Sequence, residues 1–297
     1  MKSKHLSRKK AILLVSLFFL IAVGLCLYPF LSNYIFEHQT DSLVHTVEQD
    51  VEQVDNTEKE TAFAEAKKYN EVITSGVVKL QDPFTMSVSS VAVANYRSLL
   101  NINEDGVMGL IKIPAIDVSL PIYHGTSDAV LEKGVGHLEG TSLPIGGSGT
   151  HIVLTGHSGL SNAKLFTDLD NLQIGDYFFL ETWGETLSYR VESKKVVLPS
   201  ELDDLQVVQG EDLCTLLTCT PYGVNSHRLL VRGVRAELPD TEEEQQEVVQ
   251  VHDSPSRWMM EYKSALLIGF GFFCLGLAGI LGYPYYRNKK QNRRDRT

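Results

Sequence analysis

The chain of 297 residues carries 37 acidic and 27 basic side chains, for a formal net charge of −10, and 43% of its residues are hydrophobic, enough for a sizeable core. Five bases lie in residues 1–10 and six in residues 287–297, which leaves 16 bases against 36 acids between these tails. Such an acidic body repels nucleic acid and anionic lipid, so the composition argues against a nucleic-acid-binding role.

An uncharged apolar stretch occupies residues 11–31, directly after the basic tail of residues 1–10. About 20 apolar residues suffice for a helix to cross a bilayer. A cleaved signal peptide shares this order, but its apolar core is ~7–15 residues long and ends in small residues. Residues 27–30 are bulky. We therefore expect a retained transmembrane anchor, with a cleaved signal peptide as the alternative.

A second uncharged stretch covers residues 264–286 and precedes the basic tail of residues 287–297. Basic flanks stay on the cytoplasmic side of a membrane span. The two spans therefore predict a multi-pass protein of the cell membrane, with both termini in the cytoplasm and the intervening residues outside the cell. A buried core helix is the alternative for residues 264–286, but six following bases fit a stop-transfer signal better.

Residues 37–75 are rich in Glu, Gln, Lys and Ala, and apolar residues recur in them every three or four positions. This period predicts two amphipathic helices with a break near residues 55–56. We expect both helices to pack against the main domain, because a coiled coil needs more heptads. The two apolar series are Val44, Val47, Val51 and Val54, then Phe63, Ala66 and Tyr69.

Two further segments lack a clear period. Residues 76–90 contain a turn signal with an aromatic residue, Asp82-Pro83-Phe84. Residues 237–263 are acidic and polar, which is typical of a linker or a frayed helix leading back to the membrane.

Short apolar runs alternate with Gly, Pro, Asn and Asp from residue 107 to residue 236, within residues 91–236, which we assign to the catalytic domain. This spacing predicts a mainly β domain, either a sandwich or a barrel, and periodicity does not distinguish the two. A short helix or turn is expected at residues 163–172. The predicted strands cover residues 109–113, 119–122, 152–155, 177–182, 186–194, 213–218 and 229–231.

Residues 213–235 combine a buried strand, a turn and a return strand. Cys219 ends the first strand, and Arg228 begins the second one nine residues later. The two side chains could then face one cleft, where a permanent cation favours the reactive thiolate. His157 follows a glycine at the end of another apolar strand. A cysteine, a histidine and an arginine at three strand ends suggest covalent acyl transfer.

The other cysteines do not predict a disulfide. Cys26 and Cys274 lie in the two apolar stretches. Cys214 and Cys219 are five residues apart on one strand, which places them on opposite faces and too far apart to bond. We expect Cys214 in the core, which leaves Cys219 as a free thiol.

The histidines do not predict a metal site. His151 lies six residues before His157, so the two could share one strand face, but no third ligand stands nearby. No loop has the spacing of a dedicated calcium site either, so we expect neither a metal nor another cofactor. Polar neighbours suggest that His124, His137 and His227 lie at the surface or support loops.

The sequence TLLTC at residues 215–219, with Arg228 nine residues later and TGH at residues 155–157, resembles the sortases, cysteine transpeptidases of Gram-positive cell surfaces. The run CTPYGVNSHRLLVRG, which begins at Cys219, resembles the class C branch that builds pili. The resemblance covers roughly residues 62–236 and the membrane layout. It implies an eight-stranded β-barrel with short helices.

The resemblance also implies residue roles. Cys219 would attack the Thr–Gly carbonyl of an LPxTG-like sorting signal on a pilin. His157 would protonate the leaving amine and then take a proton from the incoming amine. Arg228 would bind the substrate backbone or stabilise the oxyanion, and Thr218 would support that site. A lysine amine of another pilin would resolve the acyl enzyme, which gives a covalent pilus.

In class C sortases a loop with an Asp-Pro-aromatic motif covers the active site, and Asp82-Pro83-Phe84 matches it. The resemblance implies that Phe84 lies on the ring of His157 or fills the apolar groove. Asp82 would accept a hydrogen bond from the Cys219 thiol or pair with Arg228. The alternative is a plain turn between helix and barrel.

Two other functions stay open. The chain could be a housekeeping sortase that uses a cell-wall amine, or a surface scaffold without catalytic activity. The two predicted spans and the Asp82-Pro83-Phe84 segment favour the pilin transpeptidase. The sequence does not specify the pilin, the sorting pentapeptide or the oligomeric state.

Overall fold

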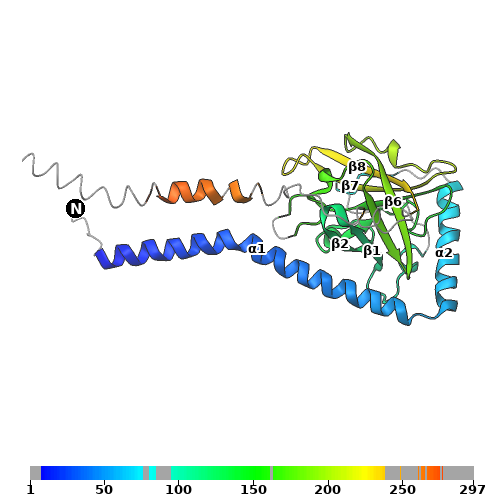
Figure 1. Cartoon of the computed structure of the whole chain (residues 1–297), viewed down its shortest axis with the longest axis horizontal. Helices are drawn as coiled ribbons and strands as arrows, with labels where there is room; N and C mark the ends of the chain where they lie inside the picture. Colours follow the sequence, from blue (N-terminus) through cyan, green and yellow to red (C-terminus); the bar gives the residue numbers. More distant parts are fainter. Residues whose placement is uncertain are drawn as a thin grey trace, which may run out of the picture. The chain divides into compact units, whose positions relative to one another are not determined.

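The computed structural model describes most of the chain between residues 8 and 237 and a few residues near the C-terminus (Figure 1). The described residues are 8–75, 80–84, 95–160, 163–237, 248, 260, 262–264, 266–274 and 276. The chain forms two units, one of Met1–Cys26 with Pro255–Thr297 and one of Leu27–Ser254. The second unit holds the barrel.

Helix α1 (Arg8–Gln53) is continuous and contains Pro29. The sequence pattern treats residues 11–31 and the first amphipathic helix as separate elements, whereas the structure joins them. Proline removes one helical hydrogen bond but keeps a helical φ, and no other breaker separates the two segments. The predicted break near residues 55–56 is confirmed, because α2 (Asn56–Ser75) begins just after α1 ends.

One helix among the described residues, Leu17–Gln53, contains a stretch that is long and apolar enough to cross a membrane. A shorter apolar helix covers Tyr262–Cys274. Most of the predicted second span, residues 264–286, lies outside the described residues, as does most of the acidic segment of residues 237–263.

The eight described strands close into a barrel in the order β1-β2-β3-β4-β7-β8-β6-β5, with β1 also pairing with β5. The pairs β2–β3 and β4–β7 are parallel, and the others are antiparallel. The barrel form that the resemblance implied is confirmed. The strands are β1 (Val107–Ile113), β2 (Val118–His124), β3 (Val135–His137), β4 (Thr150–Thr155), β5 (Tyr177–Thr182), β6 (Glu185–Val197), β7 (Asp212–Thr220) and β8 (His227–Arg235).

Short helical turns connect the strands. Sequence analysis predicts every strand except β3, whose three residues are too few to show a period. A turn of 3-10 helix lies in the predicted segment 163–172. The described short helices are η1 (Tyr96–Ser98), η2 (Pro114–Ile116), α3 (Asp128–Leu131), η3 (Leu169–Asn171) and η4 (Asp203–Leu205).

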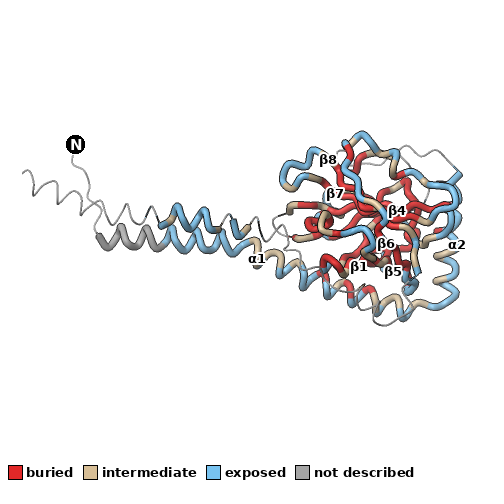
Figure 2. The backbone as a smooth tube through the Cα atoms, turned by 45° about the horizontal axis from the view of Figure 1, so that its top comes forward, coloured by how far each residue is buried: buried red, intermediate tan, exposed pale blue. Residues whose placement is uncertain are grey.

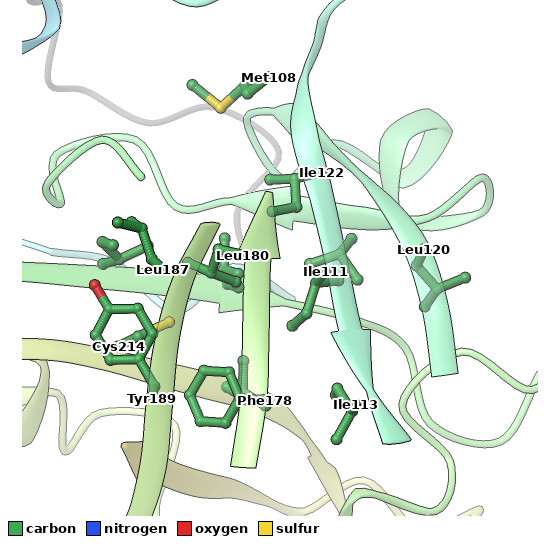
Figure 3. Packing of buried hydrophobic residues seen from close by; sticks show 14 of the residues in the cluster. Met108, Ile111, Ile113, Leu120, Ile122, Phe178, Leu180, Leu187, Tyr189 and Cys214 are labelled. Carbon is green, nitrogen blue, oxygen red and sulfur yellow. The ribbon is translucent and has the colours of Figure 1, made fainter. Parts of the chain in front are cut away.

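Buried residues gather in the strands of the barrel (Figure 2), and apolar side chains from the inner faces of these strands fill it (Figure 3). Phe178 and Tyr189 stack with their ring centroids 5.6 Å apart. Gly233 lies against Phe178, where an added Cβ would come within 2.6 Å of the ring. The inner layer therefore requires glycine at this position of β8. Helices α1 and α2 contribute buried Val44, Val47, Ala66, Tyr69 and Ile73, so the expected packing of the amphipathic helices is confirmed.

A second apolar cluster lies outside the barrel interior, and we call it the outer cluster. Its buried members come from β4, β6, β7 and β8, from the residue after β3 and from the chain between β6 and β7. Leu80 and Phe84 pack against it. This wall of the barrel, covered by residues 80–84, carries the candidate site. The buried members are Leu138, Val153, Val197, Leu205, Leu217 and Leu230.

Candidate active site

Strands β7 and β8 bring the predicted thiol and cation together. Cys219 is directly opposite Arg228 in their antiparallel register. Both residues are buried, with 6% and 3% of their surface exposed. The turn between the strands is closed by the amides of Val224 and Asn225, which donate to the carbonyl of Pro221 at 3.0 Å. The predicted strand–turn–strand unit is thus present.

His157 follows β4, which runs parallel to β7. The amide of Gly156 donates to the carbonyl of Leu217 at 3.1 Å, and the Thr218 hydroxyl donates to the carbonyl of Gly156 at 2.7 Å. These two bonds fasten the residue before His157 to the two residues before Cys219. Phe166 lies so close to Gly156 that an added Cβ would come within 2.7 Å of its ring.

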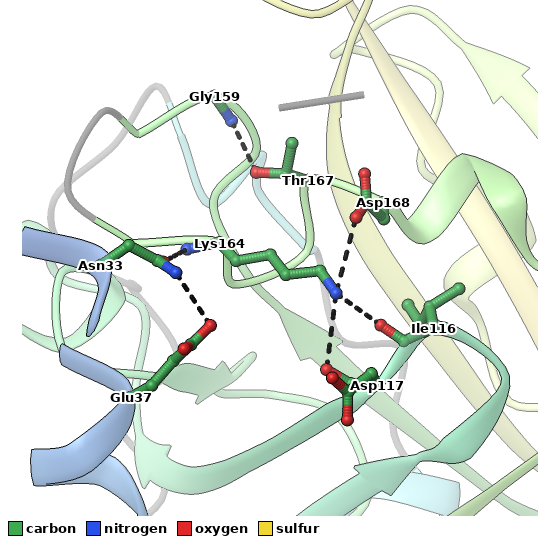
Figure 4. Close-up of polar contacts among 8 residues, drawn as sticks. All are labelled: Asn33, Glu37, Ile116, Asp117, Gly159, Lys164, Thr167 and Asp168. Atoms are coloured by element: carbon green, nitrogen blue, oxygen red, sulfur yellow. Dashed lines mark hydrogen bonds and ion pairs between the residues drawn. The ribbon is translucent and has the colours of Figure 1, made fainter. Parts of the chain in front are cut away.

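The chain after His157 is held from several sides (Figure 4). The amide of Phe166 donates to the carbonyl of His157 at 3.0 Å. The amide of Lys164 donates to Oδ1 of Asn33 on α1 at 3.0 Å. The Lys164 ammonium donates to the carbonyl of Ile116 at 2.7 Å and lies 3.5 Å from the buried carboxylate of Asp168. These contacts fix the loop that carries His157.

Residues 80–84 lie over these groups. The Asp82 carboxylate accepts two hydrogen bonds from Arg228, at 2.6 Å from Nε and 2.6 Å from Nη2. The ring of Phe84 is 5.4 Å from that of His157, and the Arg228 guanidinium carbon is 5.1 Å from the Phe84 centroid. Both contacts that sequence analysis implied for this segment, with His157 and with Arg228, are present. Pro83 lies in the turn between Asp82 and Phe84.

Burial controls the protonation of the site. It raises the pKa of the Cys219 thiol to about 11, and the Asp82 carboxylate adds to this while Arg228 opposes it. Burial also lowers the pKa of His157, against the effect of Asp128 and Glu132. With residues 80–84 in place, the site at neutral pH therefore holds a neutral thiol and a neutral imidazole.

Two histidines follow the second of the two settings predicted for them, the support of loops. His124 and His137 are buried rather than at the surface, with 4% and 0% of their surface exposed. The ring nitrogens of His124 are 2.9 Å and 2.7 Å from the carbonyls of Gly106 and Leu99. His137 is bound by the Tyr96 hydroxyl, and burial lowers its pKa to about 4. The partners Gly106, Leu99 and Tyr96 are distant in sequence, so neighbouring residues gave no signal for the burial. His227 is half-buried at the start of β8.

The remaining candidates have structural partners. His151 lies between the carbonyl of Gln206 and the hydroxyl of Thr215, both 2.8 Å from its ring nitrogens. Cys214 is fully buried in the barrel interior, as predicted, and all four cysteines are free. No group of three or more metal-binding side chains forms within the described part of the chain.

Comparison with known proteins places this geometry in a family. The profile of the Sortase domain matches residues 111–236, which include Cys219, His157 and Arg228. The chain is 42% identical to sortase C1 of GBS pilus island 1, covering 68% of this chain and 94% of that one, with a TM-score of 0.61. The chain belongs to the sortase family. Sortases are cysteine transpeptidases, so this protein is an enzyme of that class.

Other relatives agree with this sortase assignment. Sortase C-1 from Actinomyces oris is 49% identical, covering 60% of this chain and 97% of that one, with a TM-score of 0.56. Sortase A of Bacillus anthracis is 26% identical over 208 residues, which are 69% of this chain and 84% of the relative. The class C structures thus share more sequence identity with this sortase than that sortase A does.

Proposed function

We propose that this sortase builds covalent pili. It would cleave an LPxTG-like sorting signal of a pilin between Thr and Gly and join the acyl group to a lysine amine of another pilin. The observation that carries this proposal is the pair of contacts that Asp82 and Phe84 make with Arg228 and His157. The segment covers the thiol of a chain whose structural neighbours are class C sortases, one of them from a pilus island.

In the first half-reaction, His157 accepts the proton of the Cys219 thiol, and the resulting thiolate attacks the carbonyl carbon of the Thr–Gly bond. His157 donates a proton to the glycine amine as the bond breaks, and a thioester remains on Cys219. A positioned proton donor of this kind contributes ~10²–10⁴ in rate. Arg228 stabilises the developing oxyanion or holds the signal backbone.

In the second half-reaction, a lysine amine attacks the thioester carbonyl. His157 accepts a proton from that amine, an isopeptide bond forms, and the Cys219 sulfur leaves. Thr218 supports both steps indirectly, because its hydroxyl holds the carbonyl of Gly156 next to the base. This role replaces direct oxyanion support in our proposal.

Residues 80–84 act as a lid in this proposal. Asp82 occupies both guanidinium nitrogens that a substrate would use and adds negative charge next to the thiol. Two negative charges repel each other, so Asp82 disfavours the thiolate. Release of the lid would free Arg228 and expose the thiol at once. The docked state is therefore a resting state.

We further propose that residues 11–31 and 264–286 both span the membrane, with the barrel outside the cell and both basic tails inside. The apolar part of α1 and the basic flanks support this arrangement. Such an anchor would keep the enzyme where pilins emerge from the membrane.

The acceptor distinguishes this function from that of a housekeeping sortase. The enzyme with its lid opened by Asp82→Ala and Phe84→Ala is incubated with a pilin bearing an LPxTG-like signal and either a second pilin or a cell-wall peptide amine. Ladders of joined pilins are expected. Exclusive transfer to the cell-wall amine would support the housekeeping function, and release of free acid with neither acceptor would argue against both.

A further inference from the structure

One buried hydroxyl near the site is not used by the mechanism above. Thr155 is fully buried, and its Oγ1 has no hydrogen-bond partner within the described residues. Leaving such a group unpaired costs about 1–3 kcal/mol. Thr155 ends β4 two residues before His157, and its register partner Leu217 lies two residues before Cys219. Thr155 thus lies two residues before the base on one strand, and opposite the residue that precedes the thiol by two on the neighbouring strand.

The pleat of β4 decides the direction of the Thr155 side chain. Ile152 and Leu154 belong to the barrel interior, whereas Val153 belongs to the outer cluster. Because side chains alternate along a strand, Thr155 faces outward with Val153. Phe84 of the lid packs against this cluster. The lid therefore packs on the outward face of β4, the face to which Thr155 belongs.

We propose that Thr155 binds the backbone of the sorting signal, with its hydroxyl on the peptide unit between the proline and the variable residue of LPxTG. This inference rests on the proposed role of Cys219. Leu217 pairs with Thr155 on the neighbouring strand and precedes Cys219 by two residues. With ~3.3 Å per residue and ~4.8 Å between strands, this offset places Thr155 ~8 Å from Cys219. An extended signal covers that distance in two to three residues before the scissile bond, which is where this peptide unit lies.

The chemistry of that unit suits a hydroxyl. Proline has no N–H, so its carbonyl and the amide of the next residue are the groups available for hydrogen bonding there. A threonine hydroxyl can donate to the one or accept from the other. The hydroxyl would thus be paired when the signal is bound and unpaired when the lid is docked.

Thr182 provides a matched control. It ends β5, is 1% exposed, and its Oγ1 likewise lacks a partner among the described residues. Strand β5 pairs with β1 and β6, away from the β4–β7–β8 wall. Replacing either threonine by valine removes a buried unpaired hydroxyl at nearly constant volume, so the two changes should have similar effects on stability.

The test compares Thr155→Val and Thr182→Val in the full chain, in the background with Asp82 and Phe84 replaced by alanine. Cleavage of an LPxTG peptide should fall about tenfold in kcat/KM for Thr155→Val, mostly through KM, and Thr155→Ser should recover most of the loss. Thr182→Val should stay within twofold of its parent. Labelling of Cys219 by a small thiol reagent should be the same in all three variants, because none touches the nucleophile.

A second measurement changes the substrate instead of the protein. An LPxTG peptide with an ester in place of the amide between proline and the variable residue removes one donor and weakens one acceptor. The ester should lower kcat/KM in the parent and cause little further loss in Thr155→Val, because both changes remove the same bond. Equal ester effects in the two proteins, or equal kinetics for Thr155→Val and Thr182→Val, would overturn the inference. Cleavage by Cys219→Ala would instead refute the proposed function.

Discussion

Opening the lid should make Cys219 more reactive by an amount that follows from its burial. In the docked state the pKa of Cys219 is about 11, so roughly 0.03% of the thiol is ionised at pH 7.5. An ordinary thiol with a pKa of ~8.5 is ionised to about 9% at that pH. Replacing Asp82 and Phe84 with alanine would therefore raise the thiolate fraction by up to about 300-fold.

The rate of Cys219 labelling should rise less than the thiolate fraction does. Nucleophilicity falls as thiol pKa falls, with a Brønsted slope of ~0.4–0.5, which removes a factor of about 13 over 2.5 pKa units. We expect labelling of Cys219 by a small disulfide reagent to accelerate about 20-fold at pH 7.5. The pH profile should change too. The rate in the parent should rise about tenfold per unit up to pH ~11, whereas the rate in the variant should level near pH ~8.5.

Fold stability should change little in this variant. Arg228 would become solvated when the lid leaves, so the penalty for an unpaired buried charge does not apply. Asp204→Ala is the control, because it removes a carboxylate from the exposed pair with Lys195. Asp82→Asn removes the negative charge of the lid but keeps a side chain of similar shape. It therefore separates the effect of that charge on Cys219 labelling from the effect of docking. An unchanged rate of Cys219 labelling in the Asp82 and Phe84 double variant would refute the proposal that residues 80–84 act as a lid.

Three further predictions test other parts of the site and its setting. Arg228→Lys should lose at least tenfold in kcat/KM, because lysine lacks the planar fork of the guanidinium, whereas Arg232→Lys on the same strand should not. Near-normal turnover of Arg228→Lys would show that only the charge matters at this position. Lys164→Met should lower the free energy of unfolding by about 3 kcal/mol, because it leaves the buried Asp168 carboxylate without this cation. Lys195→Met at the surface should lower it by under ~1 kcal/mol in the same denaturant titration. Equal losses in the two variants would contradict the anchoring role of Lys164. Protease added to intact protoplasts should digest residues 37–263, and protection of that region would refute the topology.

Sequence analysis predicts where the candidate residues lie, because they stand at strand ends with local signals. Cys219 and Arg228 are joined by one turn, so their pairing follows from a local pattern. The position of His157 needs more, because β4 and β7 are parallel neighbours separated by two strands in the chain. The resemblance to the sortases predicted that His157 lies near Cys219, and periodicity alone did not.

The features that sequence analysis missed depend on distant partners. His124 and His137 are buried because carbonyls and a tyrosine hydroxyl from other segments bind their rings. The assignment of Thr218 to oxyanion support overlooked the Gly156 carbonyl on the neighbouring strand. Thr155 lies within the TGH motif, yet only the structure shows that its hydroxyl is buried and has no partner among the residues described. A single sequence carries no signal for such contacts.

Cys219 as the nucleophile is the centre of the proposed mechanism. The most direct measurement incubates the lid-opened enzyme with a pilin bearing an LPxTG-like signal, with and without Cys219→Ala, and follows both the thioester by mass spectrometry and the pilin ladder by denaturing gel. We expect a thioester on Cys219 and ladders in the parent, and neither in the variant, because Cys214 is fully buried in the barrel interior. Ladders formed by a folded Cys219→Ala enzyme would contradict this mechanism.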